Sequence, residues 1–403
     1  MFVRTILAMS LSCIVASHAF ATSAVEQPLN PQKLSNDVAI EDPIDPLETL
    51  ANAASSAQET DLQQDLQQAS ETINDLQKSE DKNADIGAAP TTKTTANPNA
   101  PKASWTLDGL NNAEWYENIG RGQFPVYARA HVMLNNAHAS PGAIDGASGQ
   151  NTLKAISTFQ LMNGIKPSGE LTKETWDKLI SLQGSKPTFV EYTITAEDLK
   201  TPLAKSIPHD YALQAKMPGL YYTSMTEMLG EKFHMDEAFL KQINPGANFN
   251  KVGQKIIVTN IRNNLSEDIH LIVAIKGARQ LYLFNSKNQM VGSFPASIGG
   301  TDTPSPTGTH KITGVARNPT YGYSPSNFVQ GNNLKPLTLP PGPNGPVGNI
   351  WIALNKPSFG IHGTPNPSMI SKSFSHGCIR LTNWDANDLG RKVKNGTTVR
   401  FID

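Results

Sequence analysis

A cysteine and two histidines near the carboxyl-terminal end of the chain have the types and the spacing needed for nucleophilic catalysis. His376 stands two residues before Cys378, and His362 stands 16 residues before it. A free thiol has a pKa of about 8.5, so a basic imidazole is needed to supply the reactive thiolate near neutrality. His376 shares a face with Cys378 if the segment is extended, whereas His362 needs a neighbouring strand. The residues predict a thiolate–imidazolium pair, with either histidine as the base.

Glycine beside the cysteine leaves space for a carbonyl group to approach the thiol. The backbone N–H groups around Gly377 and Cys378 could then form an oxyanion hole. The alternatives are a zinc site made by His362, His376 and Cys378, or side chains that merely fill a turn. Because the histidine–cysteine spacing is tighter than common zinc patterns, we expect a thiol enzyme with no metal and no cofactor.

The second cysteine, Cys13, lies in a segment with the features of a secretory signal peptide. Residues 1–21 combine a positive charge at Arg4 with an apolar run over Ile6–Val15, and they end in a small-x-small cleavage site. Cleavage leaves Cys378 alone in an oxidising compartment, where a lone cysteine is normally buried or used. The sequence therefore predicts an exported protein, with an uncleaved membrane anchor as the alternative.

Charge divides the remaining chain into an acidic part and a basic part. Residues 22–103 contain 14 acidic and 5 basic residues, a net charge of −9, whereas residues 104–403 contain 21 acidic and 28 basic residues, a net charge of +7. The acidic part is nearly free of aromatic residues and is predicted to be a mostly disordered spacer. The basic part favours a polyanionic partner. It lacks basic clusters interleaved with aromatics, so we expect no nucleic-acid binding.

Residues 104–182 carry apolar side chains at helical spacing, which predicts three short helices. These centre on Val126–Ala137, Leu153–Phe159 and Trp176–Ile180, and Thr172 is the expected N-cap of the third. The segment resembles the three-helix peptidoglycan-binding module of cell-wall enzymes, and a helical bundle without a ligand is the alternative. The resemblance rests on a short set of residues: Asp145, Gly146, Gly149, Thr152, Phe159 and Gln160.

Residues 183–265 are predicted to form a small α+β unit. A strand pattern over Phe189–Thr195 is followed by a helical pattern over Glu227–Gln242 and a strand over Gly253–Val258. The end of the unit resembles a LysM sugar-binding domain, and a domain that serves packing alone is the alternative. The resemblance is carried by Leu240, Asn244-Pro245-Gly246 and the run Val252–Val258. The interval before the helices is longer than in that family, and it contains Pro202, Pro208 and Pro218.

Residues 266–403 are predicted to form a mainly β domain with one helix near Trp384–Lys394, capped by Asn383. A long segment rich in proline and glycine, Asn318–Gly348, carries the aromatic residues Tyr321, Tyr323 and Phe328. Long segments without secondary structure are usually functional or disordered. Since this one precedes the strand that leads to His362, we interpret it as a flap over the substrate. The expected strands are Ile269–Ile275, Gln280–Phe284, Met290–Ile298, His310–Val315, Asn349–Leu354 and Thr397–Ile402.

Several motifs in this last segment resemble the L,D-transpeptidase catalytic domain of the YkuD/ErfK/YbiS type. They are Pro304–Ile312, Asn318-Pro319-Thr320, Gly345–Gly348, His362-Gly363-Thr364 and Ser375–Leu381, and the likeness spans about Asp268–Asp403. The resemblance implies that Cys378 is the nucleophile and His362 the proton donor and acceptor. It places His376, Ser375, Gly377 and Gly363 in the surrounding pocket. Arg380 would contact a substrate carboxylate or form an ion pair with Asp385 or Asp388.

The resemblances together imply an α+β multidomain enzyme of the bacterial cell wall, working in the periplasm. Its expected parts are a three-helix peptidoglycan-binding domain, a LysM-like domain and a mainly β catalytic domain, acting on tetrapeptide stems and glycan strands. The expected reaction forms 3-3 peptidoglycan cross-links through a cysteine thioester, with release of D-Ala and with carbapenems as covalent inhibitors. The alternatives are an outer-membrane lipoprotein amine or water as acceptor, and a noncatalytic wall-binding protein.

Overall fold

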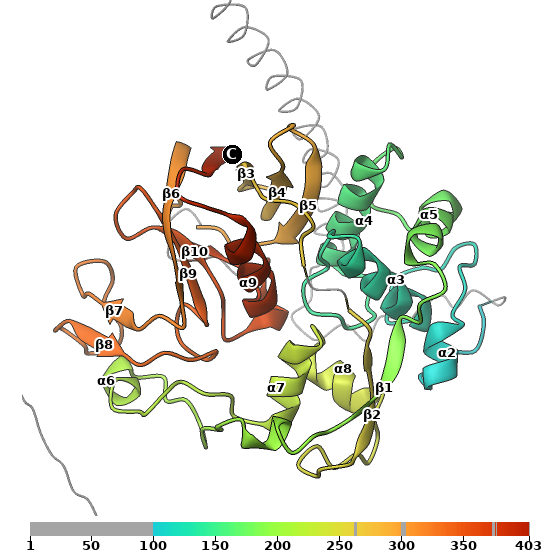
Figure 1. Cartoon of the computed structure of the whole chain (residues 1–403), viewed down its shortest axis with the longest axis horizontal. Helices are drawn as coiled ribbons and strands as arrows, with labels where there is room; N and C mark the ends of the chain where they lie inside the picture. Colours follow the sequence, from blue (N-terminus) through green and yellow to red (C-terminus); the bar gives the residue numbers. More distant parts are fainter. Residues whose placement is uncertain (1–99, 262–263, 300–303, 373–374, 376, 403) are drawn as a thin grey trace, which may run out of the picture. The chain divides into compact units, whose positions relative to one another are not determined.

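The computed structural model describes residues 100–261, 264–299, 304–372, 375 and 377–402. Figure 1 shows a helical segment, a small α+β segment and a sheet-rich segment in chain order. The predicted signal peptide and nearly all of the predicted acidic spacer lie outside the described residues. The described residues all belong to one compact unit. Within the described part of the chain, no helix combines the length and the apolar character that a membrane span requires.

The helical segment contains the three helices predicted from the sequence, preceded by a short one. Their bounds are α2 (Leu107–Asn111), α3 (Pro125–Asn136), α4 (Gln150–Met162) and α5 (Lys173–Gln183). Pro125 begins α3, where a missing N–H costs nothing. Thr172 caps α5 as predicted, because its side chain accepts a hydrogen bond from Thr175 N. The apolar faces meet in a core that includes Val126, Phe159, Trp176 and Leu179.

The next segment is a two-stranded antiparallel sheet with helices inserted between its strands (Figure 1). Its elements are β1 (Phe189–Thr193), the 3-10 turn η1 (Asp198–Lys200), α6 (Tyr211–Gln214), α7 (Met225–Lys232), α8 (Glu237–Gln242) and β2 (Lys255–Thr259). The helical pattern predicted over Glu227–Gln242 is divided in two, because His234 has a left-handed backbone with φ of 56°. The long interval before α7 contains η1 and α6.

The carboxyl-terminal segment is a mixed eight-stranded sheet in the order β11-β10-β9-β6-β12-β3-β4-β5. Parallel pairing occurs between β10 and β11 and between β12 and β3. The strands are β3 (Leu271–Ile275), β4 (Gln280–Phe284), β5 (Met290–Pro295), β6 (Gly308–Arg317), β9 (Ile350–Leu354), β10 (Gly360–His362), β11 (Ile379–Arg380) and β12 (Thr398–Ile402). A 3-10 turn, η2 (Pro367–Met369), lies between β10 and β11. The mainly β architecture predicted for this segment, and with it the overall α+β class, is confirmed.

One helix, α9 (Asn383–Lys392), packs against β9 and β10 of this sheet (Figure 1). The predicted cap of this helix was wrong by one residue. Thr382 is the N-cap and accepts a hydrogen bond from Asp385 N, whereas Asn383 is the first helical residue. Burial of the helix and the inner sheet face forms the core, which includes Ile272, Leu281, Ile312, Ile350, Ile352, Ile361, Leu389 and Val399.

The segment interpreted as a flap is ordered in part by a short hairpin. Strands β7 (Tyr321–Tyr323) and β8 (Leu337–Leu339) pair antiparallel within it. Tyr323 and Leu339 are fully buried, together with Leu220 from the interval before α7. The flap is therefore packed against a part of the chain that lies outside the carboxyl-terminal segment.

Candidate functional site

The cysteine lies at the end of a tight turn that leads directly into β11. Gly377 has a left-handed backbone with φ of 100°, and a Cβ atom there would lie 2.9 Å from Phe359 Cε1. Glycine is required at this position for both reasons. The turn is fixed by hydroxyl groups, since Ser375 Oγ donates to Cys378 O and Ser305 Oγ donates to Gly377 O at 2.7 Å. These two hydrogen bonds help to hold the backbone that presents the thiol.

The parallel pairing of β10 and β11 brings His362 onto the same face as the thiol. His362 is in register with Arg380, and Ile361 with Ile379, so Cys378 comes level with Gly360. Residues two apart on a strand share a face, with successive residues about 3.3 Å apart and neighbouring strands about 4.8 Å apart. Cys378, Arg380 and His362 therefore occupy one face, as the neighbouring-strand geometry considered from the sequence requires.

His362 is held in one tautomer by its own chain. Its Nδ1 atom lies 2.7 Å from Gly363 O, and a carbonyl oxygen can only accept, so Nδ1 carries the proton. The ring stacks on Trp351, with centroids 5.6 Å apart and an interplanar angle of 21°. In the neutral ring Nε2 is then the basic nitrogen. A side chain on Gly363 would meet Asn383, so this position also requires glycine.

Burial keeps His362 neutral near physiological pH. The side chain is 4% exposed, and loss of solvent lowers its pKa to about 4, while the hydrogen bond to Gly363 raises the pKa and Arg380 lowers it. A neutral imidazole can act as a base toward the thiol without first losing a proton.

The thiol is also neutral in this structure. Burial raises the pKa of Cys378, while the Gly360 backbone N–H and the charge of Arg380 lower it. The Sγ atom lies 3.5 Å from Ser358 O. No hydrogen bond joins Cys378 to His362 among the residues that the structure describes. The electrostatics favour a neutral thiol and a neutral imidazole, and the predicted thiolate–imidazolium pair would have to form when a substrate arrives.

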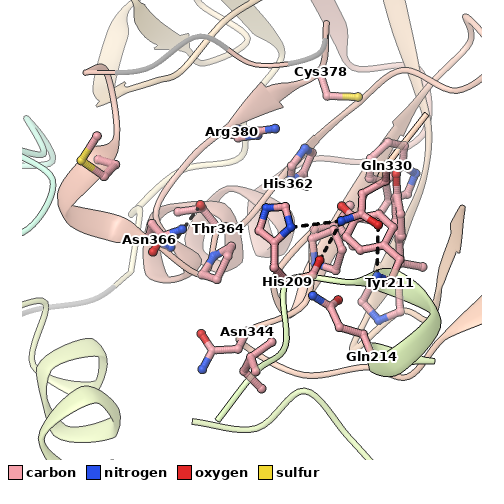
Figure 2. A pocket seen from close by; sticks show the side chains of 18 of the residues that line it. His209, Tyr211, Gln214, Gln330, Asn344, His362, Thr364, Asn366, Cys378 and Arg380 are labelled. Carbon is pink, nitrogen blue, oxygen red and sulfur yellow. Dashed lines mark hydrogen bonds between the residues drawn. The ribbon is translucent and has the colours of Figure 1, made fainter. Parts of the chain in front are cut away.

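Arg380 lies in the same cavity as the thiol and the imidazole (Figure 2). Burial lowers its pKa, while Tyr211, Cys378 and Tyr321 raise it. The ion pair with Asp385 or Asp388 is not formed in the described part of the chain. Asp385 accepts from Ser140 Oγ and Thr382, and Asp388 pairs with Arg391.

The cavity has a volume of about 1960 Å³ and is lined from several parts of the chain. Cys378, His362 and Arg380 come from the sheet edge, and aromatic and polar residues come from the flap. Further lining residues, which the sequence did not indicate, come from the interval between β1 and α7: Lys205, Ser206, Ile207, Pro208, His209, Tyr211 and Gln214. The sequence feature that could have indicated these lining residues is the proline-rich interval that departs from the LysM pattern.

The described residues bring most of the predicted site together. Cys378 and His362 line one cavity with Arg380, while Ser375, Gly377 and Gly363 shape the backbone around them. His376 lies outside the described residues. The roles assigned to all seven residues stay predictions.

Sequence comparisons identify two of the three segments. Residues 269–401 match the YkuD family, described as the L,D-transpeptidase catalytic domain. Residues 130–179 match a family described as a peptidoglycan binding domain. The LysM resemblance of residues 183–265 stays a prediction, as do the boundaries proposed between the segments.

Individual relatives extend the comparison. A Bacillus licheniformis protein with the name L,D-transpeptidase YkuD is 35% identical over 175 residues, which cover 43% of this chain and 90% of that protein. Escherichia coli YbiS, also named an L,D-transpeptidase, is 30% identical over 188 residues, covering 45% and 61%. A crystal structure of Mycobacterium tuberculosis L,D-transpeptidase 3 with a faropenem-derived adduct has a TM-score of 0.29 and 16% identity, covering 38% of this chain and 75% of that one. From the match to the Bacillus licheniformis relative across nearly its whole length, the chain belongs to the YkuD family of L,D-transpeptidases, and it carries a peptidoglycan-binding domain ahead of the catalytic domain.

Proposed function

We propose that this L,D-transpeptidase forms 3-3 cross-links between diaminopimelate residues of peptidoglycan through a thioester on Cys378. The observation that carries the proposal is that the Cys378 thiol and an imidazole whose Nε2 is its basic atom lie on one face and line one cavity. The cavity over this face is larger than the roughly 300–1,000 Å³ of a small-molecule site, which suits two peptide stems.

The first half-reaction is attack by the cysteine on a donor stem. His362 Nε2 takes the thiol proton as Sγ attacks the carbonyl carbon of the diaminopimelate residue. The tetrahedral intermediate collapses with cleavage of the bond to the terminal D-Ala, whose amine nitrogen receives the proton from His362. Backbone N–H groups of the turn that ends at Cys378 are the proposed donors to the oxyanion.

The second half-reaction transfers the acyl group to an amine. The side-chain amine of a second diaminopimelate residue attacks the thioester, the new C–N bond forms, and the C–S bond breaks as the thiol regains its proton. A lysine amine of an outer-membrane lipoprotein or a water molecule could serve instead, which would give anchoring or L,D-carboxypeptidase activity.

The other parts of the chain support action at the cell wall. The peptidoglycan-binding domain would hold the enzyme on its polymer, and the LysM-like segment would add contacts with glycan strands. Residues 1–21 would direct export to the periplasm, where the enzyme would stay associated with the wall. We expect carbapenems to acylate Cys378 because they present a reactive carbonyl group to the same nucleophile.

The test is incubation of the purified protein with tetrapeptide muropeptides, followed by mass spectrometry, with Cys378→Ala as the control. Cross-linked dimers and free D-Ala support the proposal. Tripeptides without dimers would mean that water is the acceptor. Retained binding to peptidoglycan with no conversion would contradict the enzymatic proposal and favour a noncatalytic wall-binding protein.

A further inference from the structure

A wall of the catalytic cavity comes from outside both segments that match known families. This wall segment, defined here as residues 205–214, lies between β1 and α7 and ends with α6. The family matches cover residues 130–179 and 269–401. Every wall-segment residue except Asp210, Ala212 and Leu213 lines the cavity that holds Cys378.

Hydrogen bonds attach the wall segment to the flap through Gln330. The Tyr211 backbone N–H donates to Gln330 Oε1 at 3.1 Å, and Gln330 Nε2 donates to His209 O at 2.7 Å (Figure 2). Asn333 Nδ2 adds a bond to Asp210 Oδ1 at 3.1 Å. The Gln330 side chain thus bonds to one backbone donor and to one backbone acceptor of the wall segment.

Aromatic packing fixes the same contact. The Tyr211 ring meets Tyr323 edge to face with centroids 5.4 Å apart, and Tyr321 in the same way at 5.9 Å. Phe328 makes a third edge contact at 6.4 Å. Such pairs add stability beyond the burial of their surfaces. The wall segment is therefore an ordered part of the cavity, held against the flap by both backbone and side chains.

The wall segment also reaches the charged centre of the site. Arg380 lowers the pKa of Tyr211, which burial raises, so the phenol lies within the field of the guanidinium beside Cys378. Lys205 and His209 are exposed on the cavity side of the segment. Cationic and imidazole N–H groups bind carboxylates, which peptidoglycan stems carry.

Transfer requires two stems in the cavity at once, because the acceptor must reach the thioester before water does. The sheet edge with Cys378, His362 and Arg380 accounts for one side of the cavity and for the donor. The wall segment forms another side, and its residues lie outside the family match.

We propose that residues 205–214 bind the acceptor stem and position its amine against the Cys378 thioester. This inference rests on the proposed function. The amine nitrogen bonds to the thioester carbonyl carbon, Sγ departs, and the amine proton passes to His362. Lys205 and His209 supply the polar contacts to the acceptor, while Gln330 holds the segment in place.

The experiment compares the double variant Lys205→Ala/His209→Ala and the single variant Gln330→Leu with the unsubstituted full-length protein. Lys216→Ala is the matched control, because Lys216 is an exposed cation just beyond the wall segment that does not line the cavity. Each protein receives tetrapeptide muropeptides, and three quantities are measured: released D-Ala, dimer and tripeptide. The melting temperature of each variant reports whether it is folded.

We expect the dimer-to-tripeptide ratio to fall about tenfold in both variants, which corresponds to about 1.4 kcal/mol of acceptor binding. Release of D-Ala should fall far less, and Lys216→Ala should keep the parent ratio. An unchanged ratio in folded variants would overturn the inference. The inference would also be overturned if D-Ala release fell as much as dimer formation, because the segment would then bind the donor stem. If the unsubstituted protein releases no D-Ala and forms neither dimer nor tripeptide, the proposed function itself fails.

Discussion

Cys378 and Arg380 lie two residues apart on one face, and the charge of Arg380 opposes the effect of burial on the thiol pKa. Burial is the larger effect, so the thiol stays protonated near neutral pH. The same guanidinium lowers the pKa of His362 and thereby favours the neutral imidazole. One cation thus helps to generate the nucleophile while keeping its base unprotonated.

Arg380→Met is expected to slow alkylation of Cys378 by iodoacetamide at pH 7.5. Removal of the positive charge raises the thiol pKa further and therefore lowers the thiolate fraction. The rate is followed by intact-protein mass. Lys356→Met removes an exposed cation from the nearby loop and should leave the rate close to that of the parent. Equal rates in the two variants would show that Arg380 does not act on the thiol.

His362→Ala is expected to reduce acylation by imipenem by a factor of about 10²–10⁴, the usual contribution of a general base. An unchanged adduct rate would reassign the base to His376, and His376→Ala is the comparison variant. In the parent protein the acid limb of the acylation profile should lie near pH 4, because burial lowers the His362 pKa to about 4. An acid limb near pH 6.5 would contradict a buried neutral imidazole.

Gly377→Ala is expected to impair both folding stability and acylation. The added Cβ meets Phe359 and also disfavours the positive φ, a conformation that costs about 1–2 kcal/mol for residues other than glycine. Gly396 has a φ of 89° with open space around its Cβ position, so Gly396→Ala isolates the backbone cost. Gly377→Ala should lower the melting temperature more than Gly396→Ala does. Equal shifts would show that the contact with Phe359 is not limiting.

Glu231 lies on α7, and its buried carboxyl group accepts hydrogen bonds from Asn383 of α9 and from Tyr222. Burial raises its pKa to about 8, although these hydrogen bonds lower it and Glu227 raises it. The neutral form therefore stabilises the fold fully below about pH 4.5, the ordinary value, and that contribution is lost as the pH rises toward 8.

Glu231→Gln is accordingly expected to gain stability relative to the parent between pH 5 and pH 8. The melting temperature of Glu231→Gln minus that of the parent should grow by several degrees over this pH range. A change of about 1 kcal/mol in unfolding free energy shifts the melting temperature of a domain of 150–250 residues by about 2–4 °C. Glu191→Gln, at a half-exposed ion pair with Lys255, is the control and should show no such trend. A constant difference across the pH range would mean that Glu231 is already ionised in the folded protein.

Much of the architecture could be predicted because it depends on local patterns. The three helices of residues 104–182 follow from apolar spacing, and Thr172 follows from capping chemistry. The strands of the catalytic domain follow from runs of β-branched residues bounded by turns. The cap of α9 was assigned one residue too late, since Thr382 and Asn383 are both good capping residues and local chemistry does not separate them.

The arrangement of the site depends on contacts between residues far apart in sequence, and here the sequence was less informative. The register of β10 on β11, which puts His362 and Cys378 on one face, is a product of tertiary pairing. The packing of Tyr211 against Tyr321 joins positions 110 residues apart, and no local pattern encodes it. Burial, which sets the pKa values of Cys378 and His362, also appears only in the folded chain.

The most direct measurement of the central claim is the mass of the intact protein after brief incubation with a tetrapeptide stem and an acid quench. The parent should gain the mass of the stem without its terminal D-Ala, and peptide mapping should place the adduct on Cys378 as a thioester that hydroxylamine removes. Cys378→Ser should show no adduct and release no D-Ala. Release of D-Ala by Cys378→Ser at the parent rate, or an adduct on another residue, would contradict the claim.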